Sequence, residues 1–102
     1  MSKTRLEFQT FLETLKGDRN VYFQPPSSVL MHYPAIRYNL SDLKNVPADN
    51  VAYLNKTAYT LIYITKNPED PMIRTLSELQ YCDFDRWYAS DNLNHYVYTI
   101  FY

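Results

Sequence analysis

The hydrophobic pattern is most regular over residues 95–102, where large side chains recur at every second position. Two sets alternate there: Tyr96, Tyr98, Ile100 and Tyr102 on one side, and His95, Val97, Thr99 and Phe101 on the other. A period of two with aromatic and β-branched residues predicts a β-strand. Because both faces carry large side chains, we expect one face to pack on the protein's own core and the other to meet a neighbouring subunit.

An aromatic segment from Tyr81 to Tyr88 precedes this strand and predicts its partner in a hairpin. The polar run Ala89-Ser90-Asp91-Asn92 separates the two segments and is typical of a turn. Cys82 lies among aromatic residues, so we expect a packed thiol. A reactive thiol is the alternative, but no basic residue is close enough in sequence to lower its pKa.

The N-terminal region has the period of an amphipathic helix over residues 4–16. Its apolar stripe consists of Phe8, Phe11, Leu12 and Leu15. Thr4 and Glu7 have the spacing of a capping box, and Gly17 predicts the end of the helix.

A shorter second helix is predicted from about Pro71 to Leu79. Asp70 is a favoured N-cap residue, and proline is favoured at the first helical position. The stripe expected to be buried consists of Met72, Ile73, Leu76 and Leu79. A helix this short needs packing against a sheet to be stable.

Three further strands are predicted at residues 20–24, 34–40 and 57–65. The first ends at Pro25-Pro26, so it stops there or lies at a sheet edge. The third is apolar on both faces and is expected at the centre of the sheet. Residues 41–50 read as a loop, 51–54 as a short strand or a strand-like segment, and 55–56 as a turn. The loop over residues 25–33 is apolar, so it either folds back on the core or meets a partner.

This order of elements predicts an α+β fold. We expect a two-layer sandwich in which a mainly antiparallel sheet of four to five strands carries two helices on one face. The length of 102 residues suits a single domain spanning residues 1–102.

The composition is unusual in its eleven tyrosines, which accompany five phenylalanines and one tryptophan. Tyrosine combines a large apolar ring with a polar tip, so it suits protein interfaces. A tyrosine-rich core is an equally good interpretation at this stage.

Charge and composition argue against several classes of function. Ten basic and eleven acidic residues give a net charge of −1, and no basic run favours a grip on nucleic acid. The single glycine excludes glycine-rich phosphate loops. The apolar stretches are too short to span a bilayer, and the first residues lack the apolar region of a signal peptide, so we expect no membrane partner. A lone cysteine fits a reducing cytosol.

The sequence gives little support for any catalytic residue. His32 and His95 lie far apart in sequence and lack neighbours at metal-ligand spacing. Asp83 and Asp85 share one face of the predicted strand, where paired carboxylates suit metal binding or acid–base chemistry, although solvated surface carboxylates are the better interpretation. Ser27-Ser28 has no Gly-x-Ser-x-Gly context. We therefore expect no enzymatic activity, no catalytic residue, no metal and no cofactor.

Three stretches of the sequence carry a family resemblance. They are Asn20 to Pro26 followed by Met31 to Tyr38, Ala48-Asp49-Asn50 ahead of a tyrosine-rich strand, and Phe84 to Tyr88 leading into Asp91 to His95. In these stretches the chain resembles small proteins of the head–tail joining module of tailed bacteriophages, from about residue 5 to the end. The nearest role is that of a tail terminator, also called a tail completion or tail-to-head joining protein.

The resemblance implies a structural role. Tail terminators are small α+β proteins that form a ring, typically hexameric, at the head-proximal end of the tail tube. The ring stops polymerisation of the tail tube protein and meets the head–tail connector or stopper protein, while DNA only passes through its lumen. The protein is then expected in the virion, at the tail or neck, after assembly in the host cytoplasm. The resemblance implies neither a cofactor nor catalytic residues.

An assembly role directs attention to residues that anchor protein interfaces, above all Arg, Tyr and Trp. The expected contributors are Pro25, Pro26, Met31, Tyr33, Arg37, Tyr38, Arg86, Trp87 and Tyr88. For Tyr38 and Trp87 a place in the core is an equal alternative. Two other functions also stay open: another neck component, such as a head–tail adaptor or stopper, and a small host-directed protein-binding module.

Overall fold

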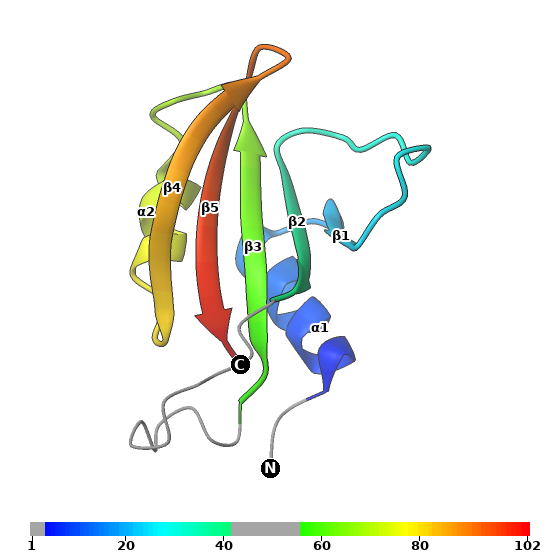
Figure 1. Cartoon of the computed structure of the whole chain (residues 1–102), viewed down its shortest axis with the longest axis vertical. Coiled ribbons are helices and arrows are strands. Elements are labelled where there is room, and N and C mark those ends of the chain that lie inside the picture. The colour runs from blue at the N-terminus through cyan, green and yellow to red at the C-terminus, as the bar shows by residue number, and fades with distance from the viewer. Residues whose placement is uncertain (1–3, 42–55) are drawn as a thin grey trace.

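The computed structural model describes residues 4–41 and 56–102 and contains one sheet with two helices. The elements are α1 (Arg5–Lys16), β1 (Val21–Phe23), β2 (Ala35–Leu40), β3 (Ala58–Thr65), α2 (Pro71–Ser77), β4 (Cys82–Ser90) and β5 (Leu93–Phe101). The strand order is β1-β2-β3-β5-β4, with β3 at the centre as predicted (Figure 1). Among the described strands only β1 and β2 pair in parallel, so the predicted α+β fold with a mainly antiparallel sheet is confirmed.

Both helices cover the same face of the sheet and lie behind it in Figure 1. From α1, the Phe8 ring packs against Tyr38, with ring centroids 5.2 Å apart. From α2, the Ile73 carbonyl accepts a hydrogen bond of 2.9 Å from the Tyr98 hydroxyl. Tyr38 and Tyr98 are both paired with Leu61, so their side chains share a face. The predicted arrangement of two helices on one face is confirmed.

The sequence signals at the ends of α1 operate as expected. The Thr4 side chain accepts a hydrogen bond from the Glu7 N–H, and the Glu7 carboxylate accepts one from the Thr4 N–H. Gly17 ends the helix at φ 88°, in the left-handed region that glycine adopts without steric cost. Phe8 and Leu12 are buried, and Phe11 and Leu15 pack against the same core.

The core between helices and sheet is rich in tyrosine. Four tyrosines are buried at 2% exposure or less: Tyr38, Tyr59, Tyr63 and Tyr98. Burial raises the pKa of each of these four hydroxyls. The hydroxyls keep polar partners, as Tyr98 does with Ile73 and Tyr63 with Asp70. Part of the tyrosine excess therefore belongs to the core.

The second helix is shorter than predicted. It ends at Ser77 rather than Leu79, because the Glu78 N–H closes the last helical turn on Arg74 and the Leu79 N–H bonds back only three residues to Leu76. Tyr81 then adopts φ 61° as the chain turns into β4. Leu79 still packs against the core.

The hairpin turn is also shorter than predicted. It consists of Asp91 and Asn92 alone, whereas Ala89 and Ser90 belong to β4 and pair with Asn94 and Leu93. The two turn residues have φ 54° and 63°. Positive φ at both positions is typical of a type I′ turn, which connects two strands through two residues only.

The first strand lies at the sheet edge, as its closing prolines predicted, and spans Val21–Phe23 rather than residues 20–24. Gln24 leaves the strand with φ 43°. The predicted loop at 42–50, the strand or strand-like segment at 51–54 and the start of the turn at Asn55 lie outside the described residues.

Candidate functional site

The strand β4 forms the second edge of the sheet and is the most exposed element of the described chain. It spans nine residues, and within residues 4–41 and 56–102 it pairs on one side only, with β5. Every residue after Cys82 is exposed. Three of its aromatic side chains are well exposed: Phe84 at 50%, Trp87 at 53% and Tyr88 at 37%. We call this strand, with those three side chains, the β4 edge.

A β-bulge sets the direction of the aromatic side chains on this strand. The pairing register shifts between Phe84 and Arg86, so Asp85 has no partner in β5. Simple alternation would place Phe84 and Trp87 on opposite faces. The extra residue instead pairs Phe84 with Tyr98 and Trp87 with Tyr96, so both lie on the helix-covered side of the sheet.

No helix of the described residues covers the opposite face of the sheet, and we call it the open face (Figure 1). Tyr88 lies there and stacks on His95, with ring centroids 4.6 Å apart and planes 10° from parallel. One row across this face consists of Arg37, Ile62, Val97 and Arg86. Val97 is only 1% exposed. The open face is therefore an apolar centre flanked by two arginines, one of which, Arg86, forms an ion pair with Asp85.

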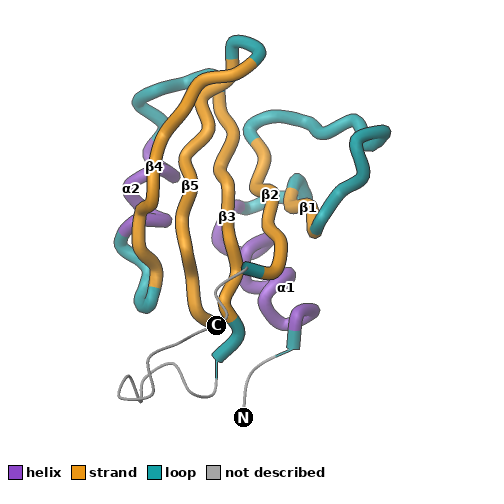
Figure 2. Tube along the Cα trace, in the orientation of Figure 1, coloured by secondary structure: helices purple, strands orange, loops and turns teal. Residues whose placement is uncertain are grey.

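The connection between β1 and β2 is a second exposed element, and we call residues 24–34 the β1–β2 loop. Figure 2 shows loop conformation throughout it. Leu30 is 81% exposed, and Val29 and Tyr33 are exposed to about half that extent. The His32 N–H donates to the Tyr22 hydroxyl at 3.1 Å, and the Val29 N–H to the Pro26 carbonyl at 3.0 Å. These bonds give the loop a defined shape.

The nine predicted interface residues fall in three places. Pro25, Pro26, Met31 and Tyr33 belong to the β1–β2 loop, and Arg86, Trp87 and Tyr88 to the β4 edge. Arg37 lies on the open face, in the same row as Arg86. The loop and the β4 edge lie at opposite edges of the sheet, so the structure does not gather the predicted residues into one site (Figure 1).

Tyr38 is the ninth residue, and its prediction as a surface contributor needs correction. Its side chain is fully buried under α1, which settles its alternatives in favour of the core. Its hydroxyl donates to the Gln9 side chain and accepts from Arg5 at 3.3 Å. Tyr38 is buried because it lies on the helix-covered face of β2, the same face as the buried Ile36 two residues earlier. For Trp87 the core alternative is wrong, because its side chain lies at the surface.

Five exposed large apolar side chains of the described residues are not among the nine predicted residues: Leu6, Val29, Leu30, Leu40 and Phe84. Leu30 could have been found, since it lies in the apolar loop over residues 25–33 that the sequence marks as a possible partner contact. Phe84 could not, because the bulge that brings it to the same side as Trp87 depends on pairing with β5.

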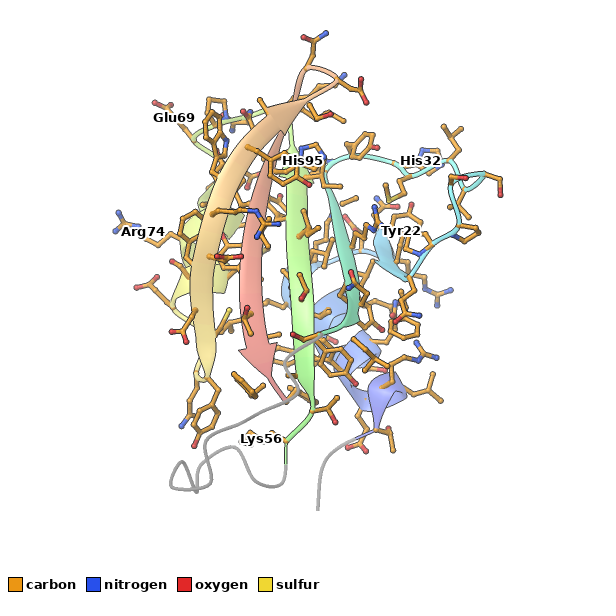
Figure 3. All side chains as sticks on the ribbon, viewed as in Figure 1. Tyr22, His32, Lys56, Glu69, Arg74 and His95 are labelled. Atoms are coloured by element: carbon orange, nitrogen blue, oxygen red, sulfur yellow. The ribbon has the colours of Figure 1, made fainter. Side chains whose placement is uncertain are left out.

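The candidate reactive groups of the described chain are the Cys82 thiol, the Asp83 and Asp85 carboxylates and the two histidines. Cys82 is buried, and burial followed by the charge of Asp83 raises the pKa of its thiol to about 11, which confirms the packed-thiol interpretation. Asp83 and Asp85 are exposed, as expected, and the register shift between Phe84 and Arg86 leaves Asp85 without a pairing partner in β5. Figure 3 shows His32 on the β1–β2 loop and His95 on the sheet, on separate elements. Within residues 4–41 and 56–102, no three His, Cys, Asp or Glu side chains group as metal ligands would.

A hollow beside the β1–β2 loop has a volume of about 510 Å³. It is lined by Met31, His32, Tyr33 and Pro34 from the loop and by Thr65, Lys66, Asn67 and Asp70 after β3. The Asp70 carboxylate already accepts hydrogen bonds from Tyr63, Thr65 and Met72. The Asp70 carboxylate, which faces this hollow, is therefore already engaged by protein donors.

No protein-family model, curated protein or solved structure matches the chain. No helix within the described residues is long and apolar enough to cross a membrane.

Proposed function

We propose that this protein is a tail terminator, a structural subunit that forms a ring at the head-proximal end of a bacteriophage tail tube. The observation that carries the proposal is the presence of two different exposed apolar surfaces, the β4 edge and the β1–β2 loop, at opposite edges of one sheet. A ring subunit needs two such surfaces, because each copy contacts its two neighbours with different patches. The resemblance of three sequence stretches to head–tail joining proteins supports the same role.

The exposed residue types also fit an assembly role. Tryptophan, tyrosine and arginine are the residues most enriched among interface anchors, and Trp87, Tyr88 and Arg86 follow one another on an exposed strand. A contiguous exposed apolar surface commonly marks a protein–protein contact. The net charge of −1 suits a ring through which DNA passes without being clamped.

In this proposal the ring has three kinds of contact. Each subunit contacts its two neighbours in the ring. One rim of the ring binds the last layer of tail tube protein and prevents further addition. The other rim receives the head–tail connector or stopper protein.

The proposal predicts that the purified chain limits growth of the tail tube. Tail tube protein from the same phage is allowed to polymerise with and without the chain, and tubes are examined by negative-stain electron microscopy. We expect shorter tubes with a ring of extra density at one end only, because a cap blocks addition at the end it covers. The control is the same chain unfolded by heat before mixing.

Other outcomes identify the alternatives. Unchanged tube lengths with binding to the isolated connector would indicate an adaptor or stopper. Unchanged tubes, no binding to tube or connector, and absence of the chain from purified virions would contradict the proposal and favour a host-directed binding module.

A further inference from the structure

We propose that the β1–β2 loop of one subunit docks onto the β4 edge of a second copy of this chain, with Leu30 packing against Phe84 and Trp87. The inference rests on the proposed function in one respect, that the chain assembles with itself, and it assigns the two surfaces of that contact.

The loop has the properties of an inserting segment. Its eleven residues, Gln24 to Pro34, contain no Asp, Glu, Lys or Arg. The loop is longer than most connections between secondary-structure elements, which have about four to six residues. Leucine is among the residue types most often buried in proteins, yet the Leu30 side chain is 81% exposed here. Its burial in a contact would remove a large apolar surface from water.

The β4 edge has matching properties. Among the described residues no strand pairs with its outer side, so it presents backbone N–H and C=O groups in a row. The bulge at Asp85 places Phe84 and Trp87 on one side of the strand, three positions apart, where both remain half exposed. Two half-exposed rings on one side of a strand form an apolar surface against which a single leucine side chain can pack.

The charges of the two surfaces are compatible. The charged residues next to Trp87 in the sequence of β4 are Asp85 and Arg86, and they form an ion pair with each other. An uncharged loop can cover this pair without leaving a single buried charge that lacks a counterion. The self-paired β4 edge and the uncharged loop therefore fit each other electrostatically.

The geometry requires the loop to come from a second copy. The loop and the β4 edge lie at opposite edges of the sheet, separated by β2, β3 and β5, so they cannot meet within one chain (Figure 1). The remaining edge strand, β1, is a poor partner for β4, because it has three residues and its Val21 carbonyl already accepts from Gln9 at 3.0 Å. A contact of loop to edge is head-to-tail, and such contacts generate rings when the rotation closes.

The test uses two surface variants and one matched control. Leu30→Asp places a charge on the loop, and Trp87→Asp places one on the edge. Leu6→Asp is the control, because Leu6 is also an exposed leucine, at 66%, but lies on α1 away from both surfaces. Circular dichroism first establishes that each variant is folded. Mass is then measured by light scattering at one concentration where the wild-type chain assembles.

We expect Leu30→Asp and Trp87→Asp each to be a single chain, and Leu6→Asp to assemble like the wild-type chain. An equal mixture of the two surface variants should form a complex of two chains and stop there. Each variant retains one intact surface, so one loop–edge contact can form and no further chain can add. A pairing of β4 with β4 predicts instead that Leu30→Asp still assembles and that mixing restores nothing.

The failure of this inference is distinct from the failure of the proposed function. If Leu30→Asp assembles like the wild-type chain, the loop contact is wrong, whereas the ring and the tube-capping experiment are unaffected. If the wild-type chain is a single chain at every concentration, a mixture of Leu30→Cys and Trp87→Cys is oxidised at pH 8. The native Cys82 does not interfere, because burial raises the pKa of its thiol to about 11. A disulfide-linked pair of the two variants supports the contact, and its absence overturns it.

Discussion

Asp70 links the start of α2 to strand β3. One oxygen of its carboxylate accepts the Met72 N–H at 3.0 Å and so caps the helix. The other accepts the Tyr63 hydroxyl at 2.7 Å and the Thr65 hydroxyl at 3.1 Å. Burial, followed by the bond to Asp70, raises the pKa of the Tyr63 hydroxyl. One side chain therefore satisfies three donors from two elements.

We predict that Asp70→Ala lowers the free energy of unfolding by about 2 kcal/mol, since it removes a helix cap and leaves two hydroxyls without their acceptor. Chemical denaturation of the purified chain measures the change. Glu69→Ala is the matched control, because Glu69 is an exposed carboxylate one position earlier. Equal stability of the two variants would contradict this account of Asp70.

The sequence identifies Asp70 as a cap but not as the acceptor for two strand hydroxyls. Asp70-Pro71 is a local signal that needs only neighbouring residues. Tyr63 and Thr65 are reached because the chain folds back after β3, which no local pattern records. The same distinction holds for Tyr38, whose burial follows from packing against α1 and not from its own identity.

In the β4–β5 hairpin, the two-residue turn sets the register of the exposed strand β4. Its two turn residues, Asp91 and Asn92, both adopt positive φ. This conformation costs most side chains about 1–2 kcal/mol, and Asn, Asp and Gly tolerate it best. The turn fixes the register in which Ser90 pairs with Leu93, and thereby the faces on which the later residues of β4 lie.

We predict that Asn92→Val lowers the free energy of unfolding by about 1–2 kcal/mol, because a β-branched side chain at positive φ clashes with its own backbone. Asn92→Gly serves as control and should be as stable as the wild-type chain or slightly more so. Thermal unfolding followed by circular dichroism compares the three. If valine were tolerated as well as glycine, the assigned turn conformation would be wrong.

At the scale of elements, regular patterns were predictable and interruptions were not. The capping residues and apolar stripe gave α1 its bounds within a residue, and two apolar faces placed β3 at the centre. The bulge at Asp85 was missed because nothing in the sequence of β4 marks it. It becomes visible only when β4 is paired with β5, and it decides that Phe84 and Trp87 share a side.

The molecule as a whole is an open sheet with two unlike edges. At one edge β1 is short and its Val21 carbonyl is occupied by Gln9. At the other edge β4 is long and aromatic. Tyrosine serves in both settings, with Tyr38 and Tyr98 in the core and Tyr88 at the exposed edge. The two interpretations of the tyrosine-rich composition thus apply to different residues.

The unlike edges are the basis of the proposed head-to-tail assembly. A subunit with a single self-complementary contact surface would pair with one partner and stop, whereas two different surfaces allow each copy to contact two neighbours. The uncharged β1–β2 loop and the aromatic β4 edge provide that difference. The role as a tail terminator stays a proposal that rests on this geometry and on the family resemblance.

The most direct test of head-to-tail assembly is the solution mass of the wild-type chain, measured by light scattering over a wide range of concentration. The account predicts one closed species of about six chains that does not grow further as concentration rises, because a closed ring has no free surface of either kind. A species of two chains at every concentration would contradict it, since that result indicates a single self-complementary surface.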